Sequence, residues 1–185
     1  MRETGRWMSG KTPSRSRPEF WQGSFPWVSP KDMKQPIMND SEEHLSEAGR
    51  RECVDVSAEA LLIVIRGMIL AHSFPIAITG RDVAFNQDMK ALVPFDPFSA
   101  KYLFNWFKWA TPIILDHISD SSHGTKRLAM DDLFDMKVPK PSPKEQQCFV
   151  ERIEALDRVE TAACTNAQTL RSLRMTFLNR VFDKP

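Results

Sequence analysis

Short apolar runs, separated by polar and turn-forming residues, fill the part of the chain before residue 98. Their β-branched, aromatic or aliphatic content is typical of short strands at residues 25–29, 61–65, 68–70, 76–78 and 91–93. A turn at Arg66 and Gly67 separates the second of these runs from the third, and residues 86–88 form a polar corner. This pattern predicts a compact, β-rich and irregular domain.

A helical period of apolar positions begins after Ser99, a residue type that caps helices. The spacing predicts a helix from Ser99 to about Trp109. One face of it carries Leu103, Trp106, Phe107 and Ala110. Pro112 predicts a kink or a restart, because proline lacks the N–H that an interior helical position donates. The apolar pattern continues at Ile113, Ile114 and Ile118 up to a break at residues 121–124.

A long C-terminal helix is the strongest local prediction. Alternating prolines at residues 138–143 make a stiff spacer, and a capping box follows, with Ser142 as N-cap, Pro143 in the first turn and Glu145 at the third position. No Gly or Pro interrupts the chain from there to Phe182, which allows about 38 helical residues, or roughly 57 Å. The fold class is therefore α+β, with one domain at residues 1–138 and the spacer and helix at 139–185.

Apolar side chains recur about every seven residues along this helix, which is typical of a coiled coil. The predicted partner contacts are Ile153, Leu156, Ala163, Leu170 and Phe177. Glu160 and Arg174 interrupt the second set of core positions. We expect a partner helix, such as that of a second copy; the rival interpretation is docking onto the chain's own domain.

Charge is balanced overall but uneven along the chain. The 25 Lys and Arg against 24 Asp and Glu exclude a histone-like polycation. Residues 1–34 hold seven basic and three acidic side chains, a net of +4, whereas residues 35–60 hold two basic and seven acidic ones, a net of −5. Such neighbouring blocks indicate two faces or loops of one domain. The basic block is no disordered tail, because it also contains Trp7, Phe20, Trp21, Phe25 and Trp27.

Cysteine usage and hydropathy indicate a cytoplasmic protein with no membrane partner. Cys53, Cys148 and Cys164 are odd in number and form no CxxC pair, so we expect neither a disulfide scaffold nor a four-thiolate zinc site. The longest apolar stretch, residues 60–71, is too short and too interrupted to span a bilayer.

No catalytic constellation is evident, so the residues favour a binding protein that holds no metal and no cofactor. The Gly-Lys-Thr at residues 10–12 lacks the upstream glycine of a phosphate loop. The four histidines show no ligand spacing: His44, His72, His117 and His123. Asp88 and Lys90 resemble half of a nuclease site, but a metal-dependent nuclease needs more than one carboxylate. A small nuclease is therefore the weakest alternative.

An ordered succession of motifs resembles that of a type I restriction–modification specificity subunit. The opening matches residues 10–15 (GKTPSR), 19–21 (EFW) and 26–33 (PWVSPKDM). The middle matches residues 65–70 (IRGMIL) and 86–92 (NQDMKAL). The end matches residues 124–125, 133, 138–139 and 143–147. An ordered succession of motifs is far more specific than any single one.

This resemblance implies that residues 1–138 are a target recognition domain for one half of a split double-stranded DNA site. It implies a noncatalytic subunit that docks methyltransferase and restriction subunits, to which S-adenosylmethionine, ATP and Mg would belong. Full subunits of the family have two such domains, whose long helices pack antiparallel. One domain and one helix imply a half-subunit that dimerises or pairs with another half, or a fragment; relatives also begin with a further strand.

Candidate DNA contacts are the basic side chains near the motifs, since Arg and Lys bind phosphates and Arg reads guanine. They are Lys11, Arg15, Arg17, Lys31, Lys34, Arg81, Lys90, Lys126 and Arg127. The competing interpretation is a solvated cationic loop. Scaffold roles are expected for Gly10, Thr12, Pro13, Asn86, Gln87, Asp88 and Gly124, and core or docking roles for Trp27, Trp106 and Trp109. The alternative function is a protein–protein adaptor, or a decayed half-subunit, without DNA binding.

Overall fold

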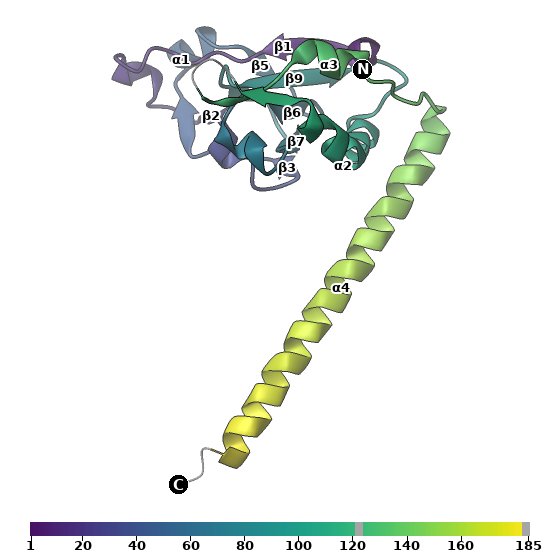
Figure 1. The fold of residues 1–185 in the computed structure, drawn as a ribbon. Coiled ribbons are helices and arrows are strands. Elements are labelled where there is room, and N and C mark those ends of the chain that lie inside the picture. The colour runs from purple at the N-terminus through teal and green to yellow at the C-terminus, as the bar shows by residue number, and fades with distance from the viewer. Residues whose placement is uncertain (121–123, 183–185) are drawn as a thin grey trace. The chain divides into compact units, whose positions relative to one another are not determined.

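The computed structural model describes residues 1–120 and 124–182, and the chain divides into two compact units. Unit 1 is Met1–Gln146 and unit 2 is Gln147–Pro185. Unit 1 holds three β-sheets and the helices α1 (Glu47–Arg51), α2 (Ala100–Asp116) and α3 (Met130–Asp135), as Figure 1 shows. Four 3-10 helices complete it: η1 (Arg2–Thr4), η2 (Pro18–Phe20), η3 (Pro30–Asp32) and η4 (Met68–Ala71). No helix within the described ranges is long and apolar enough to cross a membrane.

The largest sheet has five strands and contains most of the predicted ones. Its order is β1 (Gly5–Ser9), β9 (Met89–Pro94), β6 (Leu61–Val64), β7 (Ile76–Thr79) and β3 (Ile37–Met38). Neighbours are antiparallel except β7 and β3, which are parallel. All four residues of the central strand β6 are buried, which explains why its sequence is continuously apolar instead of alternating. The predicted strands at 61–65, 76–78 and 91–93 are therefore confirmed.

A second sheet of four strands has its own core. Its order is β4 (Glu43–Leu45), β2 (Phe25–Val28), β8 (Val83–Phe85) and β5 (Asp55–Val56), with β2 and β8 parallel. Trp27, Leu45 and Ala84 are buried together, and Trp21 and Phe25 pack against them. Strand β2 confirms the strand predicted at residues 25–29. This packing covers three of the five aromatic side chains named in the basic block, Trp21, Phe25 and Trp27.

The polar corner at residues 86–88 joins the two sheets. It connects β8 of the four-stranded sheet to β9 of the five-stranded sheet. The Asn86 side chain closes the turn, because its Oδ1 accepts a hydrogen bond from the Asp88 backbone N–H at 3.1 Å. The predicted corner is confirmed, and it fixes how one sheet is placed against the other.

Helix α2 begins as predicted and ends later. The Ser99 side chain accepts from the Tyr102 N–H at 3.2 Å, and the predicted face of Leu103, Trp106, Phe107 and Ala110 is buried. The helix does not end near Trp109, because it continues through Pro112 to Asp116 with Ile114 fully buried in its last turn. Core packing thus outweighs the hydrogen bond that proline removes. Trp109 is 69% exposed, so a core role for it is wrong.

Two other local predictions are wrong. Ile118 does not extend the helical pattern, since it lies in strand β10 (Ile118–Asp120), which pairs antiparallel with β11 (Lys126–Leu128). Residues 121–123, with the predicted break and His123, lie outside the described residues. The predicted strand at 68–70 is the 3-10 helix η4, because Gly67 turns the chain with φ 136°, in the region that favours glycine.

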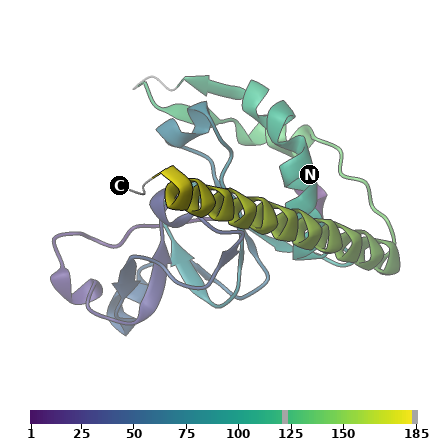
Figure 2. The same ribbon diagram turned by 90° about the horizontal axis from the view of Figure 1, so that it is seen from below.

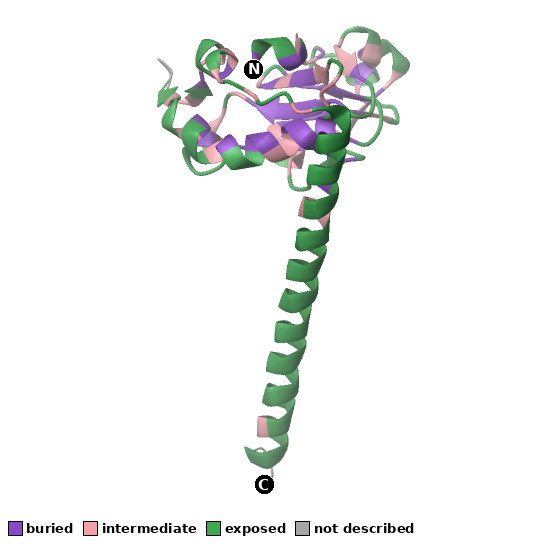
Figure 3. Ribbon diagram, turned by 90° about the vertical axis from the view of Figure 1, so that its right-hand side faces the viewer, coloured by how far each residue is buried: buried purple, intermediate pink, exposed green. Residues whose placement is uncertain are grey.

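Helix α4 (Pro143–Phe182) is the predicted long helix, and Figure 2 shows it as one continuous coil. The capping box is present: Glu145 N–H donates to the Ser142 hydroxyl at 3.4 Å, and the Glu145 carboxylate accepts from the Ser142 N–H at 2.8 Å. Figure 3 shows exposed residues along most of its length. The apolar seam side chains Leu156, Leu170 and Phe177 are each at least 65% exposed.

Gly10 tests the tight packing between the first loop and the polar corner. A Cβ atom at this position would collide with the backbone carbonyl of Asn86. We expect Gly10→Ala to lower the free energy of unfolding of unit 1 by about 2 kcal/mol or more, because backbone cannot move aside cheaply. Gly80→Ala is the matched control, since its Cβ would meet mainly the flexible Asn39 side chain. Urea unfolding followed by tryptophan fluorescence would measure both; equal losses would contradict the expectation.

Candidate nucleic-acid interface

Four chain segments that contain or adjoin the quoted motifs lie next to one another in the fold. We call residues 10–12, 65–67, 86–88 and 126–128 the loop cluster. The sequence places these segments far apart, and main-chain hydrogen bonds hold them together in the fold. Because the resemblance rests on most of these segments, their convergence makes the loop cluster the first candidate for a functional surface.

The segment at residues 10–12 is attached to the four-stranded sheet at Lys11. Its N–H donates to the Phe85 carbonyl at 2.9 Å, and its own carbonyl accepts from the Trp27 indole at 3.1 Å and from the Cys53 thiol at 3.2 Å. The next residue, Thr12, donates its hydroxyl to the Gln87 side chain. The scaffold roles predicted for this motif agree with these contacts, and the Lys11 ammonium extends from a fixed backbone.

The other side of the loop cluster is attached through Asp88. Its carbonyl accepts from the N–H groups of Ile65 at 2.9 Å and Arg66 at 3.2 Å. Strand β11 then runs beside this segment: the Gly67 N–H donates to the Lys126 carbonyl at 3.0 Å, and the Leu128 N–H donates to the Ile65 carbonyl at 3.0 Å. Main-chain bonds therefore link the four segments, the first of them through Phe85 and Met89, which flank residues 86–88.

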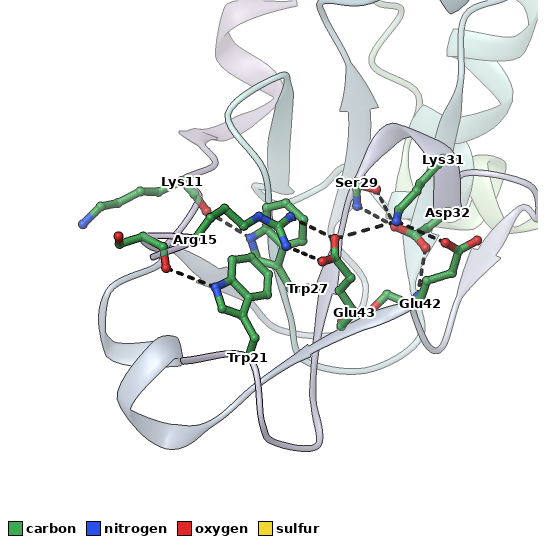
Figure 4. A network of polar contacts seen from close by, with 11 residues as sticks. Lys11, Arg15, Trp21, Trp27, Ser29, Lys31, Asp32, Glu42 and Glu43 are labelled. Carbon is green, nitrogen blue, oxygen red and sulfur yellow. Dashed lines mark hydrogen bonds and ion pairs between the residues drawn. The ribbon is translucent and has the colours of Figure 1, made fainter. Parts of the chain in front are cut away.

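Arg15 is bound within the chain by three groups (Figure 4). Its guanidinium makes a two-pronged ion pair with Glu43, and one of the two hydrogen bonds measures 2.9 Å. The same group lies over the Trp21 ring, 3.7 Å from its centroid, and 5.0 Å from that of Trp27. Bidentate pairing and stacking are the strongest surface contacts available to arginine. The Arg15 guanidinium is therefore held by contacts within the chain.

The acidic block also pairs with the three lysines of the basic block. Lys11 lies 3.5 Å from Glu52, Lys31 lies 3.1 Å from Glu42, and Lys34 lies 3.5 Å from Glu42. Arg17 instead lies 3.8 Å from Glu19 within its own loop. The two blocks of opposite charge are thus loops of one domain, as the sequence predicts, and they neutralise each other locally.

The four remaining candidate cations are in different surroundings. Lys90 donates to the Ser9 hydroxyl on the neighbouring strand β1, and Lys126 pairs with Asp120 at 2.9 Å. Arg81 and Arg127 are exposed, and neither makes an ion pair with any residue that the structure describes. The loop cluster therefore contains Lys11, Lys126 and Arg127 from the predicted set, whereas the other candidates lie outside its four segments.

Arg66 belongs to the loop cluster and is absent from the predicted DNA contacts. Its backbone forms an antiparallel bridge with Arg127, and its side chain is exposed. The sequence feature that could have identified Arg66 as a candidate DNA contact is its position inside the IRGMIL motif, beside a turn glycine. Proximity to Arg127 depends on the long-range pairing with β11, which no local pattern indicates.

Ion pairing and burial shift several pKa values in this region. The hydrogen bond from Arg15 lowers the pKa of Glu43, and the hydrogen bond to Glu42 raises the pKa of Lys31. Burial raises the pKa of the Cys53 thiol to about 11, which keeps it protonated at neutral pH and unsuited to nucleophilic chemistry.

The carboxylates do not assemble a metal site. Across residues 1–120 and 124–182, no three His, Cys, Asp or Glu side chains are placed to hold a metal ion. Asp32, for example, caps a turn by accepting from the Ser29 N–H and hydroxyl, both at 2.8 Å. It also accepts from the Glu42 N–H at 3.0 Å, so its oxygens already have partners. This geometry suits a binding surface.

Glu43→Gln tests the Arg15 ion pair. The folded-state pKa of Glu43 lies below its ordinary value of 4.5, so its ionisation stabilises the fold above that pH and stops doing so as pH falls through the lowered pKa. We expect a loss of about 1 kcal/mol near neutral pH that disappears at strongly acidic pH. Urea unfolding across pH would measure it, with Glu47→Gln as the control. A loss independent of pH would contradict the assignment.

Comparison with known proteins gives a consistent result. The sequence pattern of the type I restriction modification DNA specificity domain matches residues 5–171. The chain is 33% identical over 158 residues to the Type I restriction enzyme EcoR124I/EcoR124II specificity subunit of Escherichia coli, covering 84% of this chain and 39% of that protein. It is 30% identical over 156 residues to the MjaIX specificity subunit of Methanocaldococcus jannaschii, covering 80% and 34%. The chain thus spans well under half the length of these relatives.

Solved structures share the fold. The HsdS subunit from Thermoanaerobacter tengcongensis superposes with a TM-score of 0.66 at 16% identity, over 97% of this chain and 43% of that one. A chain from a structure on complex assembly and conformational transition of the type I R-M system gives a TM-score of 0.68, also at 16% identity, over 97% and 42%. With its sequence match spanning most of the chain, the protein belongs to the family of type I restriction modification DNA specificity domains.

Proposed function

We propose that unit 1 recognises one half of a split site in double-stranded DNA through the loop cluster. The observation that carries this proposal is the convergence of segments 10–12, 65–67, 86–88 and 126–128, held together by main-chain hydrogen bonds. A surface built this way presents several loops at once on a fixed backbone, which reading a groove of defined shape requires.

The side chains of the loop cluster have the chemistry that such reading needs. Lys11, Arg66 and Arg127 offer cationic donors for phosphate oxygens. Gln87 is exposed, so beyond its scaffold contact with the Thr12 hydroxyl its amide N–H groups can donate to a base edge. Phosphate contacts would set the position of the duplex, and the Gln87 amide would contribute sequence preference.

The ion pairs with the acidic block are compatible with this function. The Lys11–Glu52 and Lys34–Glu42 pairs are solvent-exposed on both sides, and such pairs contribute about 0–1 kcal/mol each. A phosphate can therefore replace the carboxylate at little cost. Arg15 differs, because leaving Glu43 and two indole rings costs more; we assign it to shaping the loop that presents Lys11.

We further propose that the chain carries no catalysis of its own. In this arrangement methyltransferase and restriction subunits are its partners, and S-adenosylmethionine, ATP and Mg would be bound by them. The described residues offer no metal cluster, and burial keeps the Cys53 thiol protonated. The relatives are named specificity subunits, which supports the same division of labour.

Helix α4 supplies the second binding surface in this proposal, and its partner is the helix of a second copy or of another half-subunit. Leu156, Leu170 and Phe177 form an exposed seam, and isolated apolar seams of this kind are stable only when covered. Glu160 and Arg174 both lie in the second set of core positions. Parallel pairing in register would place each of these charges against its own copy, whereas antiparallel pairing would bring Glu160 toward Arg174.

A protein–protein adaptor is the second candidate function. The mutual neutralisation of the basic and acidic blocks favours it, since it leaves few cations free for phosphates. The two functions differ in how binding to DNA responds to salt.

The salt dependence of DNA binding tests the main proposal. With the cognate methyltransferase subunit present, we expect log affinity for a labelled duplex to fall with log salt at a slope of about 3 to 5, because each phosphate contact contributes about 0.9. The methyltransferase subunit alone is the control. An adaptor adds no affinity and no slope beyond that control, and this outcome would reject DNA recognition.

Leu170→Arg tests whether the apolar seam of α4 contacts a partner helix. We expect this change to abolish self-association or docking of a partner helix, because it places a charge in the apolar seam. Gln168→Arg, two residues away and off the seam, should leave association unchanged. Light scattering of each variant, alone and with the partner subunit, gives the mass; equal masses for Leu170→Arg and the unaltered chain would exclude the seam as the contact.

A further inference from the structure

Arg66 and Arg127 form a cross-strand pair of like charges. The two residues are joined by an isolated antiparallel bridge, so they lie directly opposite each other on adjacent backbone segments. Residues opposite one another in an antiparallel pair project to the same face, with Cβ atoms about 4.5–5.5 Å apart. Both residues are exposed. Two guanidinium groups therefore emerge from neighbouring points of one surface.

The backbone beneath this pair is firmly held. The Arg66 N–H donates to the Asp88 carbonyl at 3.2 Å, and bonds from Gly67 to Lys126 and from Leu128 to Ile65 flank the bridge, each at 3.0 Å. The Leu128 side chain next to Arg127 is fully buried. The closeness of the two arginines is thus imposed by the fold and does not depend on side-chain mobility.

The pair also differs electrostatically from most other cations of the candidate set. Lys11, Lys31 and Lys34 each have a carboxylate within 4 Å, and so does Lys126 beside the pair. In the part of the chain that the structure describes, neither Arg66 nor Arg127 has an ion-pair partner. Like charges placed directly opposite are destabilising, so the arrangement is favoured once an anion lies between them.

We propose that Arg66 and Arg127 together bind a backbone phosphate of double-stranded DNA, an inference that rests on the proposed function. Arginine suits this ligand, because its planar fork of N–H donors matches the oxygens of a phosphate. Duplex DNA fits better than an acidic protein, since residues 5–171 match the sequence pattern of a DNA specificity domain. The pair anchors the duplex and sets its register on the loop cluster, and it carries no sequence preference of its own.

The test compares the double variant Arg66→Gln/Arg127→Gln with the unaltered chain, both with the methyltransferase subunit. We expect about tenfold weaker binding at physiological salt and a salt slope smaller by about 1, equally on the cognate duplex and on one of mixed sequence. Arg51→Gln is the matched control, an exposed arginine in α1 outside the loop cluster. Thermal unfolding of each variant verifies that the fold is kept.

The results distinguish failure of the phosphate contact from failure of DNA recognition. An unchanged affinity and slope in the double variant, while the unaltered chain binds DNA, would overturn the phosphate anchor and leave DNA recognition standing. A loss confined to the cognate duplex would also overturn it, since the pair would then read a base. An unaltered chain that adds no DNA affinity would reject the proposed function, and the anchor with it.

Discussion

The turn at residues 86–88 is the constraint on which most of unit 1 depends. It joins the four-stranded sheet to the five-stranded sheet, and it also binds the neighbouring segments. The Asp88 carbonyl alone accepts two N–H groups from the segment at 65–66, while the chain just before and after the turn accepts from Lys11 and Gly10. If this turn were displaced, the relative placement of the sheets and the shape of the loop cluster would change together.

Internal neutralisation of charge gives the chain a different character from a simple basic DNA-binding domain. The acidic residues that follow the basic block in sequence fold against it, so its lysines and Arg15 extend from the surface already paired. Under the proposed function, binding energy would depend on exchanging carboxylates for phosphates at chosen positions. A duplex of the right geometry would gain more from that exchange than one that reaches only a few of the cations.

Elements with a dominant local cause could be predicted from the sequence. The capping box of Ser142 and Glu145 sets the start of α4, the Ser99 cap sets the start of α2, and the apolar run of β6 identifies a buried central strand. Elements decided by distant contacts could not. Residues 68–70 have strand composition, but Gly67 and its bond to Lys126 turn them into a 3-10 helix.

The same distinction applies to the candidate site. Residue type and motif position identify Lys11 and Arg127, because cations beside turn motifs carry a local signal. They also select Arg15, whose guanidinium the fold binds to Glu43 and Trp21, and they omit Arg66, whose neighbour lies about sixty residues away in the chain. Ion pairs and strand pairs between segments distant in the chain decide which cations remain accessible. The hydrophobic pattern of the sequence does not predict these contacts.

The loop cluster is held chiefly by main-chain N–H and carbonyl groups, which every residue except proline supplies. Exchanging a side chain on these segments, at positions other than Gly10 and Gly67, therefore leaves the supporting bonds in place. A protein constructed in this way can acquire new target preferences by point substitution without first losing its fold. Such tolerance gives selection a broad set of variants on which to act, and the scaffold itself need not be rebuilt.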